Sequence, residues 1–145
     1  MAKKIKKVLI DANVFIALNW PKDSCHIQAK KILKNIEKKY QLLINNYLVA
    51  ETLTVLLLKT KDVEKTSILA NGFYYHSEPF KMLQAPKSLQ FKALKIFSKQ
   101  QKPLLSFADC TLIAQAIDQN IKTIFTFDKN IKSSPFLKRG YKFLG

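Results

Sequence analysis

The chain is poor in the residues and segments that mark several protein classes. Glycine occurs 3 times in 145 residues and the hydrophobic content is 48%, so the composition excludes collagen-like and disordered chains. Two cysteines, Cys25 and Cys110, give neither a disulfide framework nor a metal-ligand spacing, and we interpret both as reduced thiols of a cytoplasmic protein. No apolar run approaches the roughly 18 residues of a membrane helix, and the basic N-terminus lacks a signal-peptide cleavage site.

Acidic residues and arginine are also scarce, whereas lysine is abundant. Arg139 is the only arginine, aspartate and glutamate number 10 together, and the formal net charge is +15. A field of this sign favours a polyanionic partner, nucleic acid before an anionic membrane surface. Because lysine attracts phosphate rather than reading base edges, we expect mainly backbone contacts with a strong salt dependence. Solubility is the competing explanation of this charge.

The length predicts a single domain over residues 1–145. Short apolar runs alternate with helical patterns, which predicts an α/β fold with a central parallel sheet of four or five strands and helices on both faces. The predicted strands cover residues 7–11, 40–44, 80–83, 122–128 and, as a short edge strand, 141–144. The predicted helices cover residues 24–39, 47–59, 62–73, 88–99 and 106–118, and a loop passes through residues 20–23.

Four of the acidic residues lie in stretches that otherwise carry no charge. Asp11 directly follows the apolar run Val8–Ile10, and Glu51 is the sole charged residue between Tyr40 and Leu58. Asp109 is alone between Leu104 and Ile117, and Asp128 ends an uncharged run from Thr123. Burying an unpaired carboxylate costs several kcal/mol, so four such residues suggest one shared solution. A hard divalent ion, Mg²⁺ or Mn²⁺, prefers carboxylate oxygens and would neutralise them together.

Each of the four also has a purely structural interpretation. Asp11 could cap a turn after its strand, and Glu51 could pair with a distant lysine. Asp109 follows Ser106 by three residues, the spacing of a helix capping box. Asp128 could be an ordinary turn carboxylate. The joint pattern favours the metal site over these separate explanations.

The four segments around these residues resemble the motifs of the PIN-domain ribonucleases, which include the VapC-like toxins of bacterial toxin–antitoxin pairs. The resemblance covers nearly the whole chain. It rests on four segments in order, Leu9–Phe15, Asn46–Glu51, Leu105–Asp109 and Thr126–Asn130. Ala12 stands where threonine or serine is common in the family, and Asn13 keeps the polar position that follows.

The resemblance implies a Rossmann-like PIN domain and a metal-dependent endoribonuclease that hydrolyses RNA by a two-metal-type mechanism. It assigns Asp11, Glu51, Asp109 and Asp128 as the catalytic metal ligands, with Mg²⁺ or Mn²⁺ as the cofactor. We expect Asn13, Ser106 and Thr126 to support them. The family further implies an RNA substrate, a homodimer and an antitoxin partner.

Two other function classes stay open at this point. A PIN-fold module that binds RNA or protein without catalysis is the first alternative, although an intact acidic set argues against it. A phosphatase with Asp11 as nucleophile is the second, but such enzymes place an acid two residues further on, where this chain has Asn13. There is no glycine-rich phosphate loop, and Ser106 has no recognisable histidine partner for a hydrolase triad.

Overall fold

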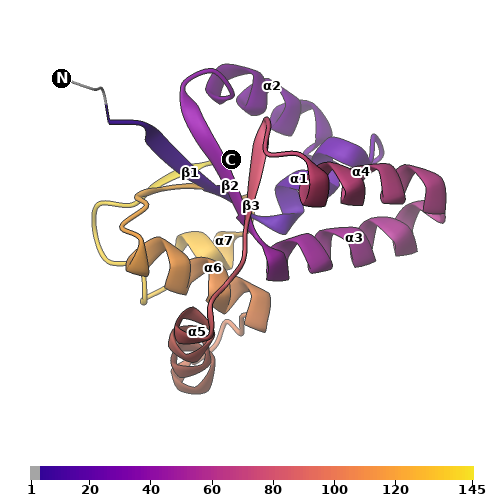
Figure 1. Ribbon diagram of the computed structural model, residues 1–145. Helices are drawn as coiled ribbons and strands as arrows, with labels where there is room; N and C mark the ends of the chain where they lie inside the picture. The colour runs from indigo at the N-terminus through magenta and orange to yellow at the C-terminus, as the bar shows by residue number, and fades with distance from the viewer. Residues whose placement is uncertain (1–3) are drawn as a thin grey trace.

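A computed structural model describes residues 4–145 of the chain. These residues form one five-stranded sheet with the order β3-β2-β1-β4-β5, and every neighbouring pair of strands is parallel (Figure 1). The strands are β1 (Lys6–Ile10), β2 (Tyr40–Asn45), β3 (Phe80–Leu83), β4 (Thr123–Phe125) and β5 (Lys142–Leu144). This confirms the predicted parallel α/β sheet and gives it five strands.

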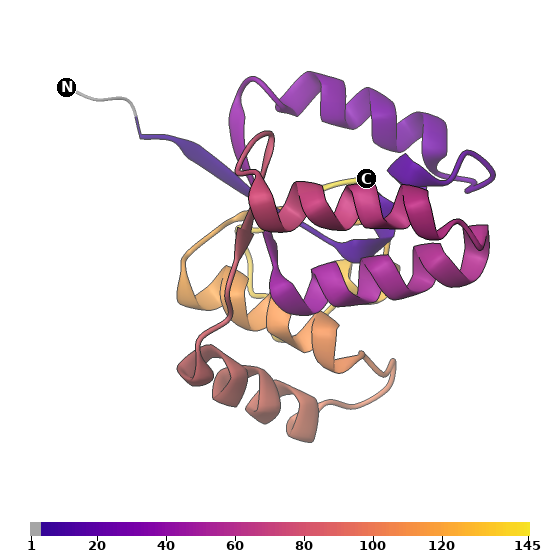
Figure 2. The same cartoon turned by 45° about the vertical axis from the view of Figure 1, so that its right-hand side comes forward.

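Helices connect the strands, as parallel pairing requires. They are α1 (Ala12–Asn19), α2 (His26–Ile36), α3 (Asn46–Thr60), α4 (Val63–Tyr75), α5 (Lys87–Lys99), α6 (Phe107–Asp118) and α7 (Lys129–Lys132). Figures 1 and 2 show α3 and α4 side by side as a long hairpin and α5 next to α6 at the other end of the molecule.

The helices cover both faces of the sheet. The ring of Phe15 in α1 lies 4.7 Å from the ring of Phe80 in β3, which places α1 on the face to which Phe80 points. Leu42 is the register partner of Phe80, so the side chains of these two residues point to the same face of the sheet. Asn45 lies three residues after Leu42, and because side chains alternate along a strand, its side chain points to the opposite face. There it contacts Gln115 of α6. The predicted two-sided covering is therefore confirmed.

The centre of the sheet is dry. Val8, Leu9 and Ile10 of β1 are all fully buried, because β1 lies between β2 and β4 and is covered from both faces. A strand that is buried on both faces typically has a continuous apolar sequence, as β1 does here. The strand ends at Ile10, and the residue that follows it at the carboxyl edge of the sheet is Asp11.

Some observed elements differ from the predicted ones, and the helix expected over residues 24–39 is shorter, since α2 covers His26–Ile36. The segment Ala12–Asn19 is helix α1, although no helix was assigned between the first strand and the loop at Trp20. The strand expected over residues 122–128 is shorter, since β4 covers only Thr123–Phe125, and Asp128 instead begins the short helix α7. Cys25 and Cys110 form no disulfide bond within residues 4–145. No helix among residues 4–145 is long and apolar enough to cross a membrane.

Candidate metal centre

The strand order reverses at β1, because the chain adds β2 and β3 on one side and β4 on the other. In open parallel sheets a crevice forms at such a switch point, at the carboxyl ends of the strands. Asp11 lies at this point. Its backbone N–H donates to the carbonyl of Phe125 at 2.9 Å, which continues the β1–β4 pairing by one residue. The buried strand thus places a carboxylate at the switch point of the sheet.

The carboxylate of Asp11 is 2% exposed and is held by three donors. Its Oδ1 accepts a hydrogen bond of 2.7 Å from the backbone N–H of Ala12, so Asp11 is also the N-cap of α1. Its Oδ2 accepts from the Thr126 hydroxyl at 2.7 Å and from the Asn13 side-chain amide at 3.2 Å. The structural role considered for Asp11 is therefore present, and the carboxylate is also fixed in one orientation.

Glu51 joins Asp11 from α3, which begins directly after β2. Asn45, the last residue of β2, caps this helix by accepting from the backbone N–H of Leu48 at 3.1 Å. Glu51 is partly buried. Its carboxylate forms no ion pair among residues 4–145, where the one ion pair found joins Lys92 and Asp118. Pairing with a lysine, the structural alternative for Glu51, is not observed.

Asp109 lies in the first turn of α6 and closes the capping box that its spacing from Ser106 predicts. The Ser106 hydroxyl accepts from the backbone N–H of Asp109 at 3.1 Å, and Oδ2 of Asp109 accepts from the backbone N–H of Ser106 at 3.0 Å. Negative charge is favourable at a helix N-terminus. This capping hydrogen bond engages Oδ2 of Asp109, and one carboxylate oxygen of Asp109 lies close to those of Asp11 and Glu51, so the capping and the metal interpretations are compatible.

These three acidic residues converge. Asp11, Glu51 and Asp109 each offer one carboxylate oxygen, and these oxygens lie within 4.8 Å of one another. They come from the end of β1, from α3 and from the start of α6, so the fold brings together residues that lie 40 and 58 positions apart in the sequence.

Burial and the charges of neighbouring carboxylates raise the pKa values of all three carboxyl groups. Burial raises the pKa of Asp11 to about 7, with a further contribution from the charge of Asp109, although the hydrogen bonds from Thr126 and Ala12 act in the other direction. The pKa of Glu51 is raised by burial and by the charges of Asp109 and Asp128. Burial also raises the pKa of Asp109, against the hydrogen bonds from Ser106. Without a cation this cluster favours bound protons.

The donor set fits a hard divalent cation. It consists of carboxylate oxygens alone, which Mg²⁺ and Mn²⁺ prefer, and it contains no imidazole or thiolate of the kind that zinc and copper sites use. The neighbouring thiol of Cys110 is fully buried, and burial raises its pKa to about 11, so it stays protonated. The structure thus offers a place where one divalent cation would offset most of the negative charge of three carboxylates.

Asp128 stands apart from the three. It is the N-cap of α7, where its Oδ1 accepts from the backbone N–H of Asn130 at 2.8 Å, as an ordinary turn carboxylate would. Its charge nevertheless contributes to the raised pKa values of Glu51 and Asp109. The structure therefore places Asp128 beside the cluster but outside the group of close oxygens, and its role as a fourth ligand remains a prediction.

The three residues expected to support the site all contact its carboxylates or their neighbours. Thr126 and Asn13 bind Asp11, and Ser106 binds Asp109. The side-chain oxygen of Asn13 also accepts from the backbone N–H of Phe127 at 3.2 Å. Asn13 therefore links the start of α1 to the segment after β4. An ionised acid at position 13 could not donate a hydrogen bond to Asp11 as the amide of Asn13 does.

Sequence reasoning missed a buried polar network beneath the site. The side-chain amide of Asn45 donates to the Thr111 hydroxyl at 3.2 Å and to the Gln115 side chain at 3.0 Å. All three residues are at most 1% exposed. The network joins the start of α3, which carries Glu51, to α6, which carries Asp109. Polar residues within the otherwise apolar helix of Asp109 were the available signal.

No curated protein matches the chain. Among solved structures, the chain is similar to VapC20 of Mycobacterium tuberculosis, a sarcin–ricin loop cleaving toxin. The two share 20% sequence identity with a TM-score of 0.78, and the match covers 90% of this chain and 97% of that one. It is also similar to VapBC2 of Rickettsia felis bound to a promoter DNA fragment, with 13% identity, coverage of 95% and 98%, and a TM-score of 0.66.

A third similar structure is a toxin–antitoxin complex of Klebsiella pneumoniae, with 16% identity, coverage of 94% and 99%, and a TM-score of 0.63. At these identities the likeness establishes a shared fold. The family model of the PIN domain matches residues 8–137, the segment from β1 through α7 that holds all of the acidic residues described above. The chain belongs to the PIN domain family.

Proposed function

We propose that the chain is a metal-dependent endoribonuclease and the toxin of a toxin–antitoxin pair. The observation that carries the proposal is the convergence of Asp11, Glu51 and Asp109 at the switch point of the sheet. Three buried or half-buried carboxylates with raised pKa values are a costly arrangement for stability alone, and such groups cluster at functional sites.

Asp11, Glu51 and Asp109 would hold the metal. We propose Asp128 as a fourth ligand, because its charge already acts on Glu51 and Asp109. When bound, Mg²⁺ or Mn²⁺ supplies charge stabilisation for a phosphodiester and lowers the pKa of a coordinated water. Asp11 contributes a carboxylate that Thr126, Asn13 and the start of α1 hold rigidly. The capping box does the same for Asp109. These groups act as ligands and orienting residues, and none needs to act as a nucleophile.

The charge of the chain supports a nucleic-acid substrate. A net charge of +15 attracts a polyanion, while the acidic cluster alone would repel phosphate. A bound divalent cation offsets two of the three negative charges and is itself a ligand for phosphate oxygens, so a metal-loaded centre and a lysine-rich surface are consistent with a phosphodiester substrate. The described activity of VapC20, a sarcin–ricin loop cleaving toxin, supports RNA over DNA.

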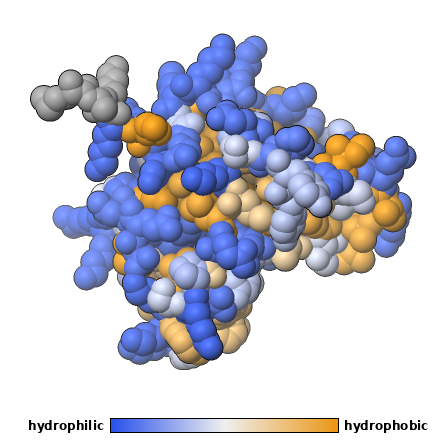
Figure 3. Space-filling view, viewed as in Figure 1, coloured by the Kyte–Doolittle hydropathy of each residue, from blue (hydrophilic) through white to orange (hydrophobic). Residues whose placement is uncertain are grey.

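The similar structures from Klebsiella pneumoniae and Rickettsia felis are toxin–antitoxin proteins, which supports an antitoxin partner, and we also propose a homodimer. Figure 3 shows apolar side chains gathered at the end of the molecule formed by α3 and α4. Leu58, Val63 and Ile68 are exposed there, and exposed apolar patches of this kind are typical of contact surfaces. Size-exclusion chromatography with light scattering would give the mass of the chain in solution and so test the proposed homodimer.

Cleavage of RNA by the purified chain tests the proposed activity. We expect internal cuts in single-stranded RNA with Mn²⁺ or Mg²⁺ and none with EDTA, followed by recovery when the metal is restored. Binding of RNA without cleavage in the presence of either metal would contradict the nuclease and would favour the non-catalytic module. Trapping of a phosphate on Asp11 would instead favour the phosphatase.

A further inference from the structure

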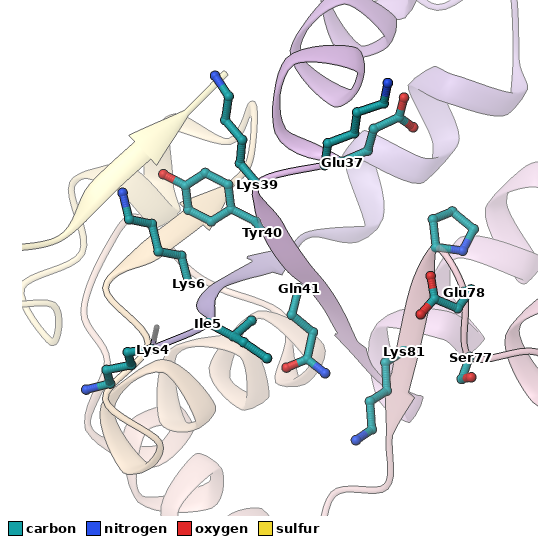
Figure 4. A pocket seen from close by; sticks show the side chains of 12 residues that line it. Lys4, Ile5, Lys6, Glu37, Lys39, Tyr40, Gln41, Ser77, Glu78 and Lys81 are labelled. Carbon is teal, nitrogen blue, oxygen red and sulfur yellow. The ribbon is translucent and has the colours of Figure 1, made fainter. Parts of the chain in front are cut away.

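A second charged feature lies at the opposite edge of the sheet, where β1, β2 and β3 begin. A hollow of about 750 Å³ opens there between the first residues of β1, the turn before β2 and the segment that leads into β3 (Figure 4). The lysines that line it are Lys4, Lys6, Lys38, Lys39 and Lys81. All five are exposed. We call this feature the lysine hollow.

The positive charge of the lysine hollow is only partly balanced. Glu37 and Glu78 also line it, so five ammonium groups face two carboxylates and three positive charges remain. Neither glutamate forms an ion pair with these lysines, since the ion pair found within residues 4–145 joins Lys92 and Asp118 elsewhere. The ammonium groups are therefore available to a ligand.

The chemistry of the lining suits phosphate groups. Lysine is a strongly hydrated point charge with three donors, and it binds phosphate as a point charge without the bidentate geometry that arginine provides. The uncharged polar side chains of Gln41, Tyr40 and Ser77 add hydrogen-bonding groups at the same place. Neighbouring parallel strands lie about 4.8 Å apart, so Lys6 and Lys81, two strands apart, present separated charges along the edge.

We propose that the lysine hollow is a second nucleic-acid contact, which holds the phosphate backbone of the RNA away from the metal centre; this rests on the ribonuclease function proposed above. The carboxylates lie at the carboxyl ends of the strands and the lysines at the amino ends. From Lys6 to Asp11 the direct path along β1 is roughly 17 Å, and the path over the surface is longer. Long RNA reaches both sites, and a short oligonucleotide reaches one.

The test compares long and short RNA on a variant of the lysine hollow. The triple variant Lys6→Gln, Lys39→Gln and Lys81→Gln is titrated with labelled single-stranded RNA of roughly 30 and roughly 6 nucleotides in EDTA, where no cleavage occurs. We expect the affinity for the long RNA to fall about tenfold near 100 mM salt. The slope of log Kd against the logarithm of the salt concentration should decrease by about two, because about two fewer counterions are released. Cleavage of the short RNA with Mn²⁺ should stay at the wild-type rate.

A matched variant controls for the loss of net charge. Lys31→Gln, Lys65→Gln and Lys95→Gln removes three exposed lysines that do not line the hollow, and it should bind the long RNA within about twofold of the wild type. An equal loss in both variants would overturn the proposal in favour of a diffuse charge effect. Wild-type affinity in the hollow variant would also overturn it and would leave the hollow to an acidic peptide or a small anion.

The two proposals fail in different ways. If the wild-type chain cuts no RNA with either metal, the nuclease proposal fails, whatever the binding data show. If the wild type cuts the short RNA but the hollow variant binds the long RNA normally, only the second contact is lost.

Discussion

The hydroxyl of Thr126 donates a hydrogen bond of 2.7 Å to Oδ2 of Asp11, across 115 positions of the chain. The hydroxyl oxygen of Thr126 itself accepts from the backbone N–H of Asp128 at 3.0 Å and from the side-chain amide of Asn13 at 3.3 Å. A hydroxyl has one donor and two acceptor positions, so every hydrogen-bonding position of Thr126 is used. Thr126 thus connects the ends of β1 and β4 and orients the most buried carboxylate of the site.

Replacing Thr126 by valine removes these three hydrogen bonds at nearly constant volume. We expect Thr126→Val to lower the free energy of unfolding by about 1–3 kcal/mol, because buried partners lose their hydrogen bonds. Affinity for Mn²⁺ should fall about tenfold, since groups that orient ligands typically contribute that much. Chemical denaturation and calorimetric titration measure the two effects.

Thr126→Ser keeps the hydroxyl and serves as the control. It should restore Mn²⁺ affinity to within about threefold of the wild type, with only the loss of a methyl group in stability. Equal Mn²⁺ affinity in the valine variant and the wild type would show that Thr126 does not position Asp11 for a metal.

The raised pKa of Asp11 predicts how the stability of the metal-free protein depends on pH. The carboxyl group has a pKa of about 7 in the folded state, above its ordinary value of 3.8, so the folded protein binds the proton more tightly than the unfolded chain. Stability from this group is present below the unfolded pKa and is lost as pH rises through about 7. Denaturation in EDTA between pH 4 and pH 8 measures this dependence.

The variant Asp11→Asn isolates that contribution, because asparagine does not titrate. We expect its stability to fall less between these pH values than that of the wild type. Parallel pH profiles for the two proteins would contradict the raised pKa of Asp11.

The same variant should lack metal-dependent cleavage of RNA while remaining folded. Asp11→Asn removes the central ligand charge, and it also removes repulsion with Asp109 and Glu51. We therefore expect activity to fall at least about a hundredfold and the melting temperature in EDTA to equal or exceed that of the wild type. Asp62→Asn, at the exposed N-cap of α4, is the control, since asparagine caps a helix as well as aspartate. Full activity in Asp11→Asn would refute the assignment.

Mn²⁺ should stabilise the folded protein through the same carboxylates. At a hundred times Kd, binding adds about 2.7 kcal/mol to the free energy of unfolding, which corresponds to a rise of roughly 5–10 °C in melting temperature for a chain of this size. Glu51→Gln should lose most of that rise. Glu64→Gln, an exposed glutamate in the first turn of α4, should keep it, and an equal rise in both variants would remove Glu51 from the site.

The buried centre of the fold could be predicted because it follows local rules. Val8–Ile10 is a continuous apolar run, which is typical of a strand covered on both faces, and the sheet order then places Asp11 at a ligand-binding edge. The capping box of Ser106 and Asp109 has a fixed spacing of three residues. Both features need only neighbouring residues, and both are present in the structure.

The elements that were missed depend on contacts between distant residues. Helix α1 is buried over most of its surface, at Ala12, Val14, Phe15, Ile16 and Ala17, so it shows no helical alternation of apolar and polar residues, and a short apolar run cannot be assigned by periodicity. The pairing of Asn45 with Gln115 spans 70 positions. No local pattern states that these two side chains meet.

The end of β4 shows the same limit. The apolar alternation through Phe127 favoured a strand up to Asp128. In the structure the side chain of Asp128 instead accepts from the N–H of Asn130 and starts α7. A turn carboxylate and a strand-end ligand are identical in sequence, and only the three-dimensional placement separates Asp128 from the group formed by Asp11, Glu51 and Asp109.

The most direct test of the central claim is the anomalous scattering of Mn²⁺ in crystals of the chain. A single metal centre formed by residues from β1, α3 and α6 predicts a strong anomalous peak within about 2.5 Å of carboxylate oxygens of Asp11, Glu51 and Asp109. An Mn²⁺ soak that gives no peak at these carboxylates, at concentrations that stabilise the protein in solution, would contradict the account.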